Sequence, residues 1–281
     1  MSRIGVGCVV VAAAFAGAAQ SGQGQPDVQE IIRRSVAATE ENWKLAPDYA
    51  FMERDIESKK DHGKTTKTYV VLMIDGSPYN KLTAVNGQPL SKGEAAAEEQ
   101  KLQEAIQTRR RESSRERAKR IAKYQRERTS DEAMMKEMTE AFQFRPAGEE
   151  TLNGHSCWVF DATPKPGYQP KTRETKVLLG MKGRLWIDKS EYQWVRVKAE
   201  VTRPVRMYGL LARVGPGTRF ELDQEPVAAN LWLPRHYSVN VAATALGFFN
   251  EDSTDDETYW NYQPVSRQMA MQSSGGKGSP Q

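Results

Sequence analysis

Trp194-Val195-Arg196-Val197-Lys198-Ala199-Glu200-Val201 is the stretch of sequence that decides the fold. From Val195 onward, apolar residues alternate with charged residues, and this period of two is typical of a β-strand with one buried and one solvent-exposed face. The short apolar segment Arg184–Asp188, just before it, predicts a neighbouring strand. Strands with a single dry face are typical of antiparallel sheets, and such a sheet needs another layer to cover that face.

The strand pattern extends outward from this pair over the whole second half of the chain. The other strands expected after Pro146 are Cys157–Thr163, Thr218–Asp223, Leu231–Val241 and Thr258–Tyr262. Asn153-Gly154 is the turn that leads into the first of them. Pro234 lies inside Leu231–Val241, and a proline within a strand indicates either an edge strand or a bulge. About five to six antiparallel strands are therefore predicted here.

The first part of the chain predicts a helix followed by two or three strands. Between Val28 and Trp43 apolar residues recur every three to four positions, which indicates an amphipathic helix, and Pro47 closes it. Two strands, Asp48–Glu57 and Thr65–Ile74, are expected around the turn Asp61-His62-Gly63. A further hairpin has Asn86-Gly87 at its tip, because both residues tolerate the positive φ of a type I′ turn.

A long polar insertion separates these two sets of strands. Residues 91–142 contain no proline and are rich in Glu, Lys, Arg, Gln and Ala, which favours helix. A break is expected near Ser113-Ser114 or Thr129-Ser130-Asp131. Residues 109–128 hold ten Lys or Arg and three Glu, a formal charge of +7, whereas the whole chain carries +4. The positive charge thus belongs to this segment, and we expect its middle to stand mostly in water.

The N-terminus predicts export. Arg3 precedes an apolar run from Ile4 to Phe15, and Ala16-Gly17-Ala18 forms the small-residue exit of a secretory signal peptide. The run is too short to span a membrane. We therefore expect cleavage near Ala18 or Ala19 and a periplasmic mature protein, in which Cys157 is the single cysteine and a buried one.

The strand motifs resemble those of a known superfamily. Gly183-Arg184-Leu185-Trp186-Ile187-Asp188 followed by Trp194-Val195-Arg196-Val197 resembles the periplasmic lipoprotein carrier superfamily, which includes the outer-membrane lipoprotein-sorting proteins. Asn230-Leu231-Trp232-Leu233-Pro234 and Tyr259-Trp260-Asn261-Tyr262 are similar to strands of related exported proteins. The resemblance implies an incomplete barrel, lidded by helices, around a cavity that holds acyl chains in the sorting proteins. The insertion at 91–142 departs from that pattern.

Residues and resemblance together predict an α+β protein. We expect a curved antiparallel half-barrel sheet, covered by an N-terminal helix, with a long charged helical insertion. The predicted segments are a signal peptide (1–19), a linker (20–27), the helix and first strands (28–90), the basic insertion (91–142), the remaining strands (143–265) and a disordered tail (266–281).

Aromatic residues in the expected strands are the candidate ligand site. They are Tyr69, Trp158, Phe160, Trp186, Trp194, Trp232 and Trp260. One interpretation is that they line an apolar cavity for acyl chains, since ligand pockets are mostly apolar. The other is that they form the core of a sheet beneath a helix.

Basic residues of the insertion are candidates for contact with an anionic surface. They are Arg109, Arg110, Arg111, Arg115, Arg117, Lys119 and Arg120. They either form a solvated helix face or meet anionic lipid headgroups or another polyanion. Nucleic acid would suit the charge but not the export signal, so we expect no nucleic-acid partner.

The sequence carries no recognisable catalytic or metal-binding motif. Its three histidines, His62, His155 and His236, are isolated, and neither a G-x-S-x-G elbow nor a phosphate-binding G-x-x-x-x-G-K is present. The acidic run Glu251–Glu257 is expected to be a solvated hairpin loop. We therefore predict a non-enzymatic envelope protein without cofactor that binds a hydrophobic or lipidated ligand. The alternative is an interaction or sensor module that binds a partner protein and carries no lipid.

Overall fold

The computed structural model describes residues 27–59, 63–206, 212–245, 249–250 and 253–266. The predicted signal peptide, the linker before Asp27, the turn at 60–62 and the tail from residue 267 lie outside these residues, and so do His62, Glu251 and Asp252. No helix in the described ranges has an apolar stretch long enough to span a membrane.

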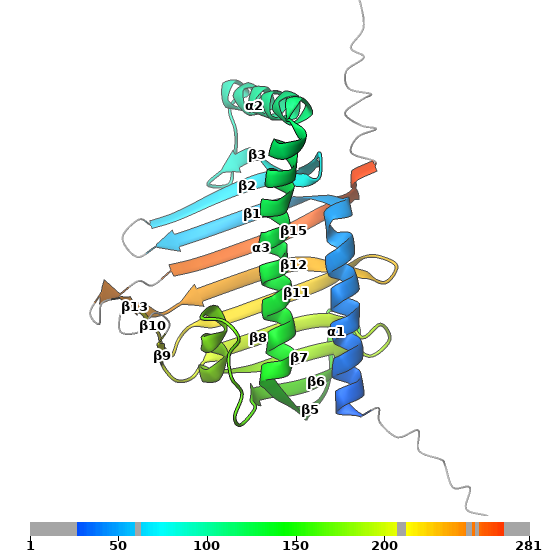
Figure 1. Ribbon diagram of the computed structural model, residues 1–281, viewed down its shortest axis with the longest axis vertical. Coiled ribbons are helices and arrows are strands. Elements are labelled where there is room, and N and C mark those ends of the chain that lie inside the picture. The colour runs from blue at the N-terminus through cyan, green and yellow to red at the C-terminus, as the bar shows by residue number, and fades with distance from the viewer. Residues whose placement is uncertain (1–26, 60–62, 207–211, 246–248, 251–252, 267–281) are drawn as a thin grey trace, which may run out of the picture.

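One large antiparallel sheet dominates the structure (Figure 1). It has 11 strands in the order β4-β3-β2-β1-β15-β12-β11-β8-β7-β6-β5, and it stays open because β4 and β5 form its two edges. The strands are β1 (Tyr49–Lys59), β2 (Gly63–Ile74), β3 (Ser77–Val85), β4 (Gln88–Pro89), β5 (Phe142–Leu152), β6 (His155–Pro164), β7 (Met181–Asp188), β8 (Trp194–Val201), β11 (Arg219–Ala228), β12 (Leu231–Val241) and β15 (Ser253–Pro264). The predicted α+β class with an open antiparallel sheet is confirmed.

A second, small sheet lies beside the ends of the central strands (Figure 1). It pairs four short strands in the order β14-β13-β10-β9, which are β9 (Val205–Arg206), β10 (Ala212–Val214), β13 (Ala243–Ala245) and β14 (Phe249–Asn250). A 3₁₀ segment, η2 (Glu174–Gly180), precedes β7, and another, η1 (Ala46–Asp48), follows the first helix.

The described residues also form three α-helices: α1 (Val28–Leu45), α2 (Lys92–Arg111) and α3 (Ser114–Ala141). The break predicted near Ser113-Ser114 is confirmed. Ser113 begins α3 with a capping box, in which its hydroxyl accepts from the Glu116 N–H and the Glu116 carboxylate accepts from the Ser113 N–H. The alternative break at 129–131 is wrong, because α3 runs through it without interruption.

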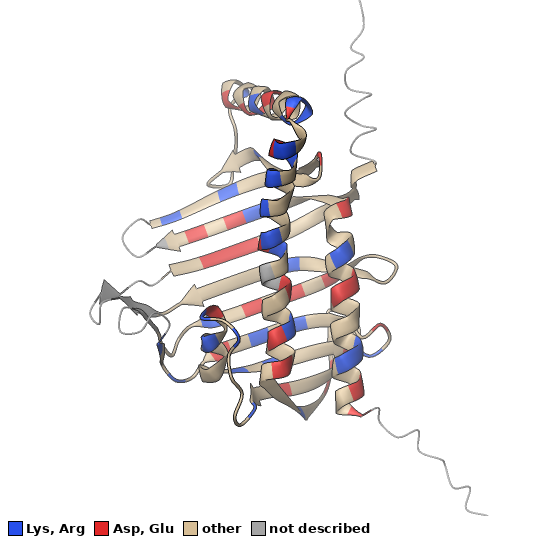
Figure 2. Ribbon diagram, viewed as in Figure 1, with Lys and Arg blue, Asp and Glu red and all other residues tan. Residues whose placement is uncertain are grey.

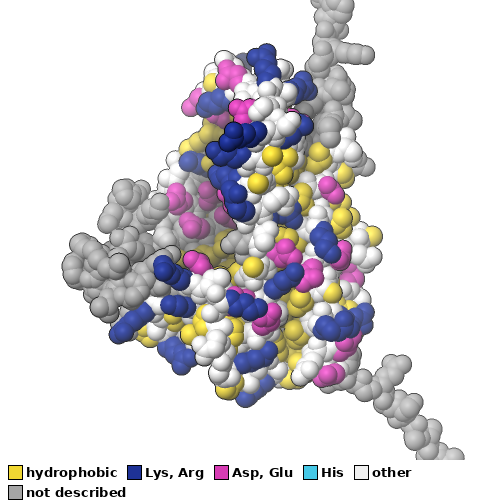
Figure 3. All heavy atoms as spheres, viewed as in Figure 1, with side chains coloured by type: hydrophobic (Ala, Val, Ile, Leu, Met, Phe, Trp, Pro, Cys, Tyr) yellow, Lys and Arg dark blue, Asp and Glu magenta, His cyan; other side chains and the backbone are white. Residues whose placement is uncertain are grey.

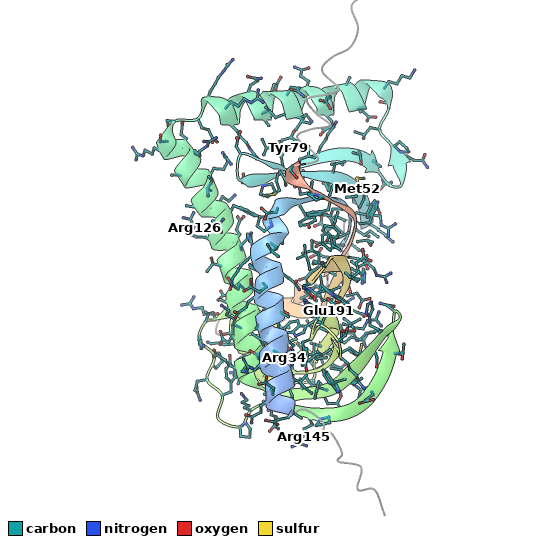
Figure 4. All side chains as sticks on the ribbon, turned by 90° about the vertical axis from the view of Figure 1, so that its right-hand side faces the viewer. Arg34, Met52, Tyr79, Arg126, Arg145 and Glu191 are labelled. Atoms are coloured by element: carbon teal, nitrogen blue, oxygen red, sulfur yellow. The ribbon has the colours of Figure 1, made fainter. Side chains whose placement is uncertain are left out.

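Helices α1 and α3 lie side by side on the concave face of the sheet (Figures 1 and 4). Lys136 of α3 forms an ion pair with Glu40 of α1 at 3.3 Å. The apolar side of α1 buries Ile31 and Ile32 against the sheet, where they form one core cluster with Phe160, Leu185, Ile187 and Trp194. The predicted covering helix is thus in place over one half of the sheet.

Helix α2 packs on the opposite face of the sheet, at its β3 side. Leu102 and Ile106 are buried against Leu72 and Ile74 of β2. Since side chains of a strand alternate between faces, Tyr69 of β2 points away from α2 and toward the concave side. The link between α2 and α3 therefore carries the chain past the β2–β3 turn, from one face of the sheet to the other.

Of the two readings of Pro234, the bulge is confirmed and the edge strand is not. β12 lies between β11 and β15, and beside Pro234 the extra residue Arg235 bulges from β12 opposite Asp223/Gln224 of β11. One expectation about the strands needs correction. The acidic residues Asp255, Asp256 and Glu257 do not form a loop. They belong to β15, which pairs with β1 and β12 along their length, so long-range pairing overrides their low strand propensity.

The two predicted turn pairs are confirmed by their backbone. Asn86 and Gly87 have φ of +52° and +77°, and Asn153 and Gly154 have φ of +53° and +86°. Both central residues of each turn are left-handed, as a type I′ hairpin requires.

Candidate functional site

Three of the predicted aromatic residues belong to the core beneath α1. Phe160 and Trp194 are almost completely buried there. The indole Nε1 of Trp194 donates a hydrogen bond of 3.0 Å to the Ser35 hydroxyl of α1. Trp158 is partly buried at the margin of this cluster, with its ring 5.3 Å from that of Tyr192. These side chains fill the space between helix and sheet.

Trp186 and Trp232 lie on the other face of the sheet. They form a separate cluster with Cys157, Val159 and Val195. Both indole N–H groups donate outward to carboxylates at the surface, that of Trp186 to Glu150 at 2.8 Å and that of Trp232 to Glu191 at 3.0 Å. They are therefore separated by the sheet from Phe160 and Trp194.

The two remaining aromatic candidates lie apart from both clusters. Trp260 is 37% exposed, and Tyr69 is partly exposed on the concave side of β2. The seven candidate residues are thus distributed over both faces of the sheet. One cavity cannot be lined by all of them.

A small pocket lies between α1 and α3. It is lined by Val36, Thr39, Glu40, Trp43, Glu132, Met135, Lys136 and Trp194. Its volume of about 10 Å³ has room for about one water molecule. An acyl chain does not fit there in this arrangement.

Beyond α1, the concave face continues as a partly exposed row of side chains. Directly opposite residues of antiparallel strands share a face, and the pairs run Leu185–Val197, Val197–Leu222, Leu222–Tyr237, Tyr237–Glu257 and Glu257–Asp55. Because Leu185 belongs to the core under α1, the entire row lies on the concave side. We call the part beyond α1 the concave groove: Glu53, Tyr69, Phe220, Leu222, Tyr237, Val239, Glu257 and Tyr259.

The figures show this region as an indentation. In Figure 2 the acidic parts of β1 and β15 lie to the left of α3, and in Figure 3 the surface is hollowed there, with acidic side chains on the floor. All eight residues of the concave groove are partly exposed. The rings of Phe220 and Tyr237 pack edge-on at 5.3 Å, so part of the floor is apolar.

Burial shifts the acids of the concave groove toward their neutral forms. The pKa of Glu53 is raised to about 7, first by burial and then by the negative charges of Glu257 and Asp55. Burial also raises the pKa of Glu257, although a hydrogen bond from the Tyr259 hydroxyl opposes that rise. Burial, with the neighbouring Glu257 charge, raises the pKa of Tyr259 as well. The floor is therefore less negative than its residue types suggest.

Three of the predicted basic residues hold the β2–β3 turn and do not stand free. The Arg109 guanidinium donates to the carbonyls of Ile74, Ser77 and Pro78 at 2.8–2.9 Å. Arg120 binds Ser77 Oγ at 2.7 Å, and Arg117 lies 3.3 Å from Asp75. The expectation that the basic segment is mainly solvated is wrong for Arg109 and Arg120, which are partly buried because polar atoms of the turn lie within their reach. Arg117 is exposed, as expected, beside the Asp75 carboxylate.

The other four predicted basic residues are exposed. Arg110, Arg111, Arg115 and Lys119 form no ion pair with any residue that the structure describes. They surround the elbow between α2 and α3.

The cysteine and the two described histidines lie outside the concave groove. Cys157 is buried, and burial raises its thiol pKa to about 11, so the thiolate is scarce at neutral pH. His155 faces Asp188 at 3.5 Å, and His236 faces Asp256 at 3.0 Å. In the ranges described, His, Cys, Asp and Glu form no group of three placed to hold a metal ion.

The sequence interpretation missed most of the concave groove. Glu53, Glu257 and Tyr259 were not candidates, although each lies two positions from an acidic residue on its strand. That spacing puts Glu53 and Asp55 on one face, and likewise Asp255 and Glu257. The pattern indicates an acidic strand face, but it does not show that the two strands are neighbours.

Comparison with known proteins finds similarity to solved structures alone. No family model and no curated protein matches the chain. A LolA superfamily protein from Nitrosomonas europaea matches with 12% identity over 84% of this chain and 92% of its own, at a TM-score of 0.30. A DUF1329 family protein from Desulfovibrio piger has 10% identity over 84% and 92%, at 0.32. A putative outer membrane lipoprotein-sorting protein domain from Vibrio parahaemolyticus has 12% identity over 83% and 92%, at 0.29.

The TM-scores of these superpositions are low, so the fold is assigned from the strand order of the sheet and the position of the helices. An open 11-stranded antiparallel sheet with an N-terminal helix in its concave face is the LolA-like half-barrel that the strand motifs predict.

Proposed function

We propose that this protein is a non-catalytic component of the cell envelope that binds an apolar or acylated ligand in the concave groove. The observation that carries the proposal is the row of partly exposed side chains beyond α1. Phe220, Leu222, Tyr237 and Val239 keep apolar surface in contact with water on the face that α1 covers elsewhere. Apolar surface of this kind, gathered in a hollow, favours a ligand that removes it from water.

The energetics suit an acyl chain. Each methylene group transferred from water contributes about 0.8 kcal/mol, so about ten of them supply roughly 8 kcal/mol before the cost of ordering the chain. The partly neutral state of Glu53 lowers the cost of placing an apolar chain over the acidic floor. The pocket between α1 and α3 is too small to contribute unless α1 moves.

The envelope location rests on the predicted export signal at 1–19. Its apolar run and small-residue exit are those of a secretory signal peptide. A periplasmic protein that holds an apolar group in an open groove shields that group during its passage through water. This is the transport role that the superfamily resemblance implies.

Binding of a partner protein without lipid is the alternative. A partner strand would add to an exposed sheet edge, and β5 is the longer of the two edges. Pro146 offers no N–H to such a strand, and a bulge between Pro146 and Gly148 interrupts the pairing pattern. The concave groove therefore supports the ligand proposal better than this edge supports the alternative.

A charge placed in the concave groove tests the proposal. N-Phenyl-1-naphthylamine, a neutral apolar fluorophore, should bind to the purified protein and lose affinity at least tenfold in the Val239→Asp variant. Asn240→Asp is the matched control, because Asn240 is the next residue of β12 and is exposed on the opposite face. Equal affinity in the two variants, both folded by circular dichroism, would refute binding in the concave groove.

A further inference from the structure

The elbow between α2 and α3, residues 109–128, has more positive side chains than its acidic side chains and fold contacts can pair. Its three acidic residues already have partners. Glu112 accepts two hydrogen bonds from Arg120, at 2.7 and 2.6 Å. Glu116 caps α3 through Ser113, and Glu127 lies 3.8 Å from Lys123. No acidic side chain of residues 109–128 is therefore left to balance the remaining cations.

Nine of the ten cations of this segment divide into an inward and an outward set, and the tenth, Lys123, is paired with Glu127. Arg109, Arg117 and Arg120 hold the β2–β3 turn, and Arg128 donates to the Trp43 carbonyl of α1. The outward set is Arg110, Arg111, Arg115, Lys119 and Arg126, all exposed and without an ion pair among the described residues. Only the inward set therefore stabilises the fold through contacts with other elements.

Three of the outward residues form one stripe along α3. Arg115, Lys119 and Arg126 are four and seven residues apart, which places them on one side of a helix with 3.6 residues per turn. Figure 4 shows Arg126 on the side of α3 that faces away from the sheet, and Figure 3 shows basic side chains gathered over α3 beside the hollow. We call Arg115, Lys119 and Arg126 the outer stripe.

We infer that the outer stripe docks the protein on a membrane surface of anionic lipid headgroups. Cations near such a surface each strengthen binding by about fivefold, and their effects combine when they face it together. A single-stranded nucleic-acid site would instead combine cations with exposed aromatic rings. Tyr124, the one aromatic residue of 109–128, is partly buried with the Arg128 guanidinium 5.6 Å from its ring centre.

Docking in this way would turn the concave side toward the lipid. Helix α3 lies on that side of the sheet (Figure 1), and Arg126 of the outer stripe is on its far surface (Figure 4). The inference does not depend on a ligand in the concave groove, since charge alone provides the attraction.

Vesicle co-sedimentation tests the inference. The full mature chain should bind vesicles that contain phosphatidylglycerol and should not bind vesicles of phosphatidylcholine alone. The triple variant Arg115→Gln, Lys119→Gln and Arg126→Gln should bind the anionic vesicles about 100-fold more weakly. The matched control removes the same charge elsewhere by Lys92→Gln, Arg145→Gln and Lys165→Gln. These three residues are exposed and lie outside α3, at the start of α2, in β5 and directly after β6. It should lose less than about fivefold.

Three outcomes would overturn the inference: equal loss in the two triple variants, equal binding of the unaltered protein to both kinds of vesicle, or a loss in the stripe variant that appears for a DNA oligonucleotide and not for vesicles. Probe binding measured without vesicles reports on the concave groove alone. Failure of one proposal is thereby distinguished from failure of the other.

Discussion

Glu53 and Glu257 lie diagonally across the seam between β1 and β15, and the charge of Glu257 raises the pKa of Glu53. The register pairs Glu53 with Tyr259 and Asp55 with Glu257, so all four side chains share the concave face. Each acidic residue is partly buried next to a tyrosine or another acid. Ionisation of these acidic residues therefore destabilises the folded protein at the place where the ligand is proposed to bind.

The pH dependence of stability follows from Glu53. Its pKa is about 7 in the folded protein and near 4.5 when exposed, so its proton is held more tightly in the folded state. Stability from this group is complete below pH 4.5 and is lost as the pH rises through 7. We expect Glu53→Gln to increase the free energy of unfolding at pH 8 by about 1–2 kcal/mol, a figure reduced for partial solvent screening. Urea unfolding at pH 5 and pH 8 measures it, and the same difference at both pH values would contradict the assignment.

The hydrogen bond between Trp194 and Ser35 links α1 to β8. Both residues are buried, and the Ser35 hydroxyl also donates to the Ile32 carbonyl at 2.9 Å. Ser35→Ala leaves the indole N–H without a partner and should cost about 1–3 kcal/mol. In a Trp194→Phe background the same substitution should cost clearly less, because the indole N–H is gone. Chemical denaturation of the four proteins gives the coupling, and strictly additive effects would argue against this contact.

Arg109 should resist replacement by lysine. Its guanidinium reaches three carbonyl oxygens of the β2–β3 turn, and a lysine ammonium cannot reproduce that fork. We expect Arg109→Lys to lower the free energy of unfolding by about 1–3 kcal/mol.

Hydrogen exchange should then speed up at Asp75 and Gly76, the turn that Arg109 holds. Arg110→Lys is the control, because Arg110 is the adjacent residue and is exposed, and its effect should stay within about 0.5 kcal/mol. Similar exchange rates in the two variants would mean that the Arg109 contacts do not hold the turn.

Local chemistry made part of this structure predictable. Asn86-Gly87 forms its turn because two adjacent residues tolerate positive φ, and Ser113 begins α3 because its own hydroxyl caps the helix. The strand at Trp194–Val201 follows from alternation alone. These features depend on residues within a few positions of one another, so the sequence displays them directly.

The distribution of the tryptophans was not predictable in the same way. Trp186 pairs with Arg196, whereas Ile187 pairs with Trp194, so a one-residue bulge at Val195 shifts the register between them. That shift places Trp194 under α1 and leaves Trp186 on the other face. No local pattern marks the bulge, and an interpretation by residue type therefore grouped the two side chains together.

The concave groove was hidden for a related reason. Glu53, Tyr69 and Tyr259 come from three strands, two of which are about 200 residues apart in the sequence. Their meeting depends on β15 pairing with β1, and the acidic composition of β15 points locally toward a loop. The pairing becomes visible only when the complete sheet order is known.

Lipid extraction tests the central claim most directly. The exported protein would be purified without denaturant, extracted with organic solvent and analysed by mass spectrometry, beside the Val239→Asp and Asn240→Asp variants. The proposal predicts an acyl-chain compound in the unaltered protein and in Asn240→Asp, and its loss in Val239→Asp. Folded, unaltered protein that yields no such compound and does not bind the apolar fluorophore would contradict it.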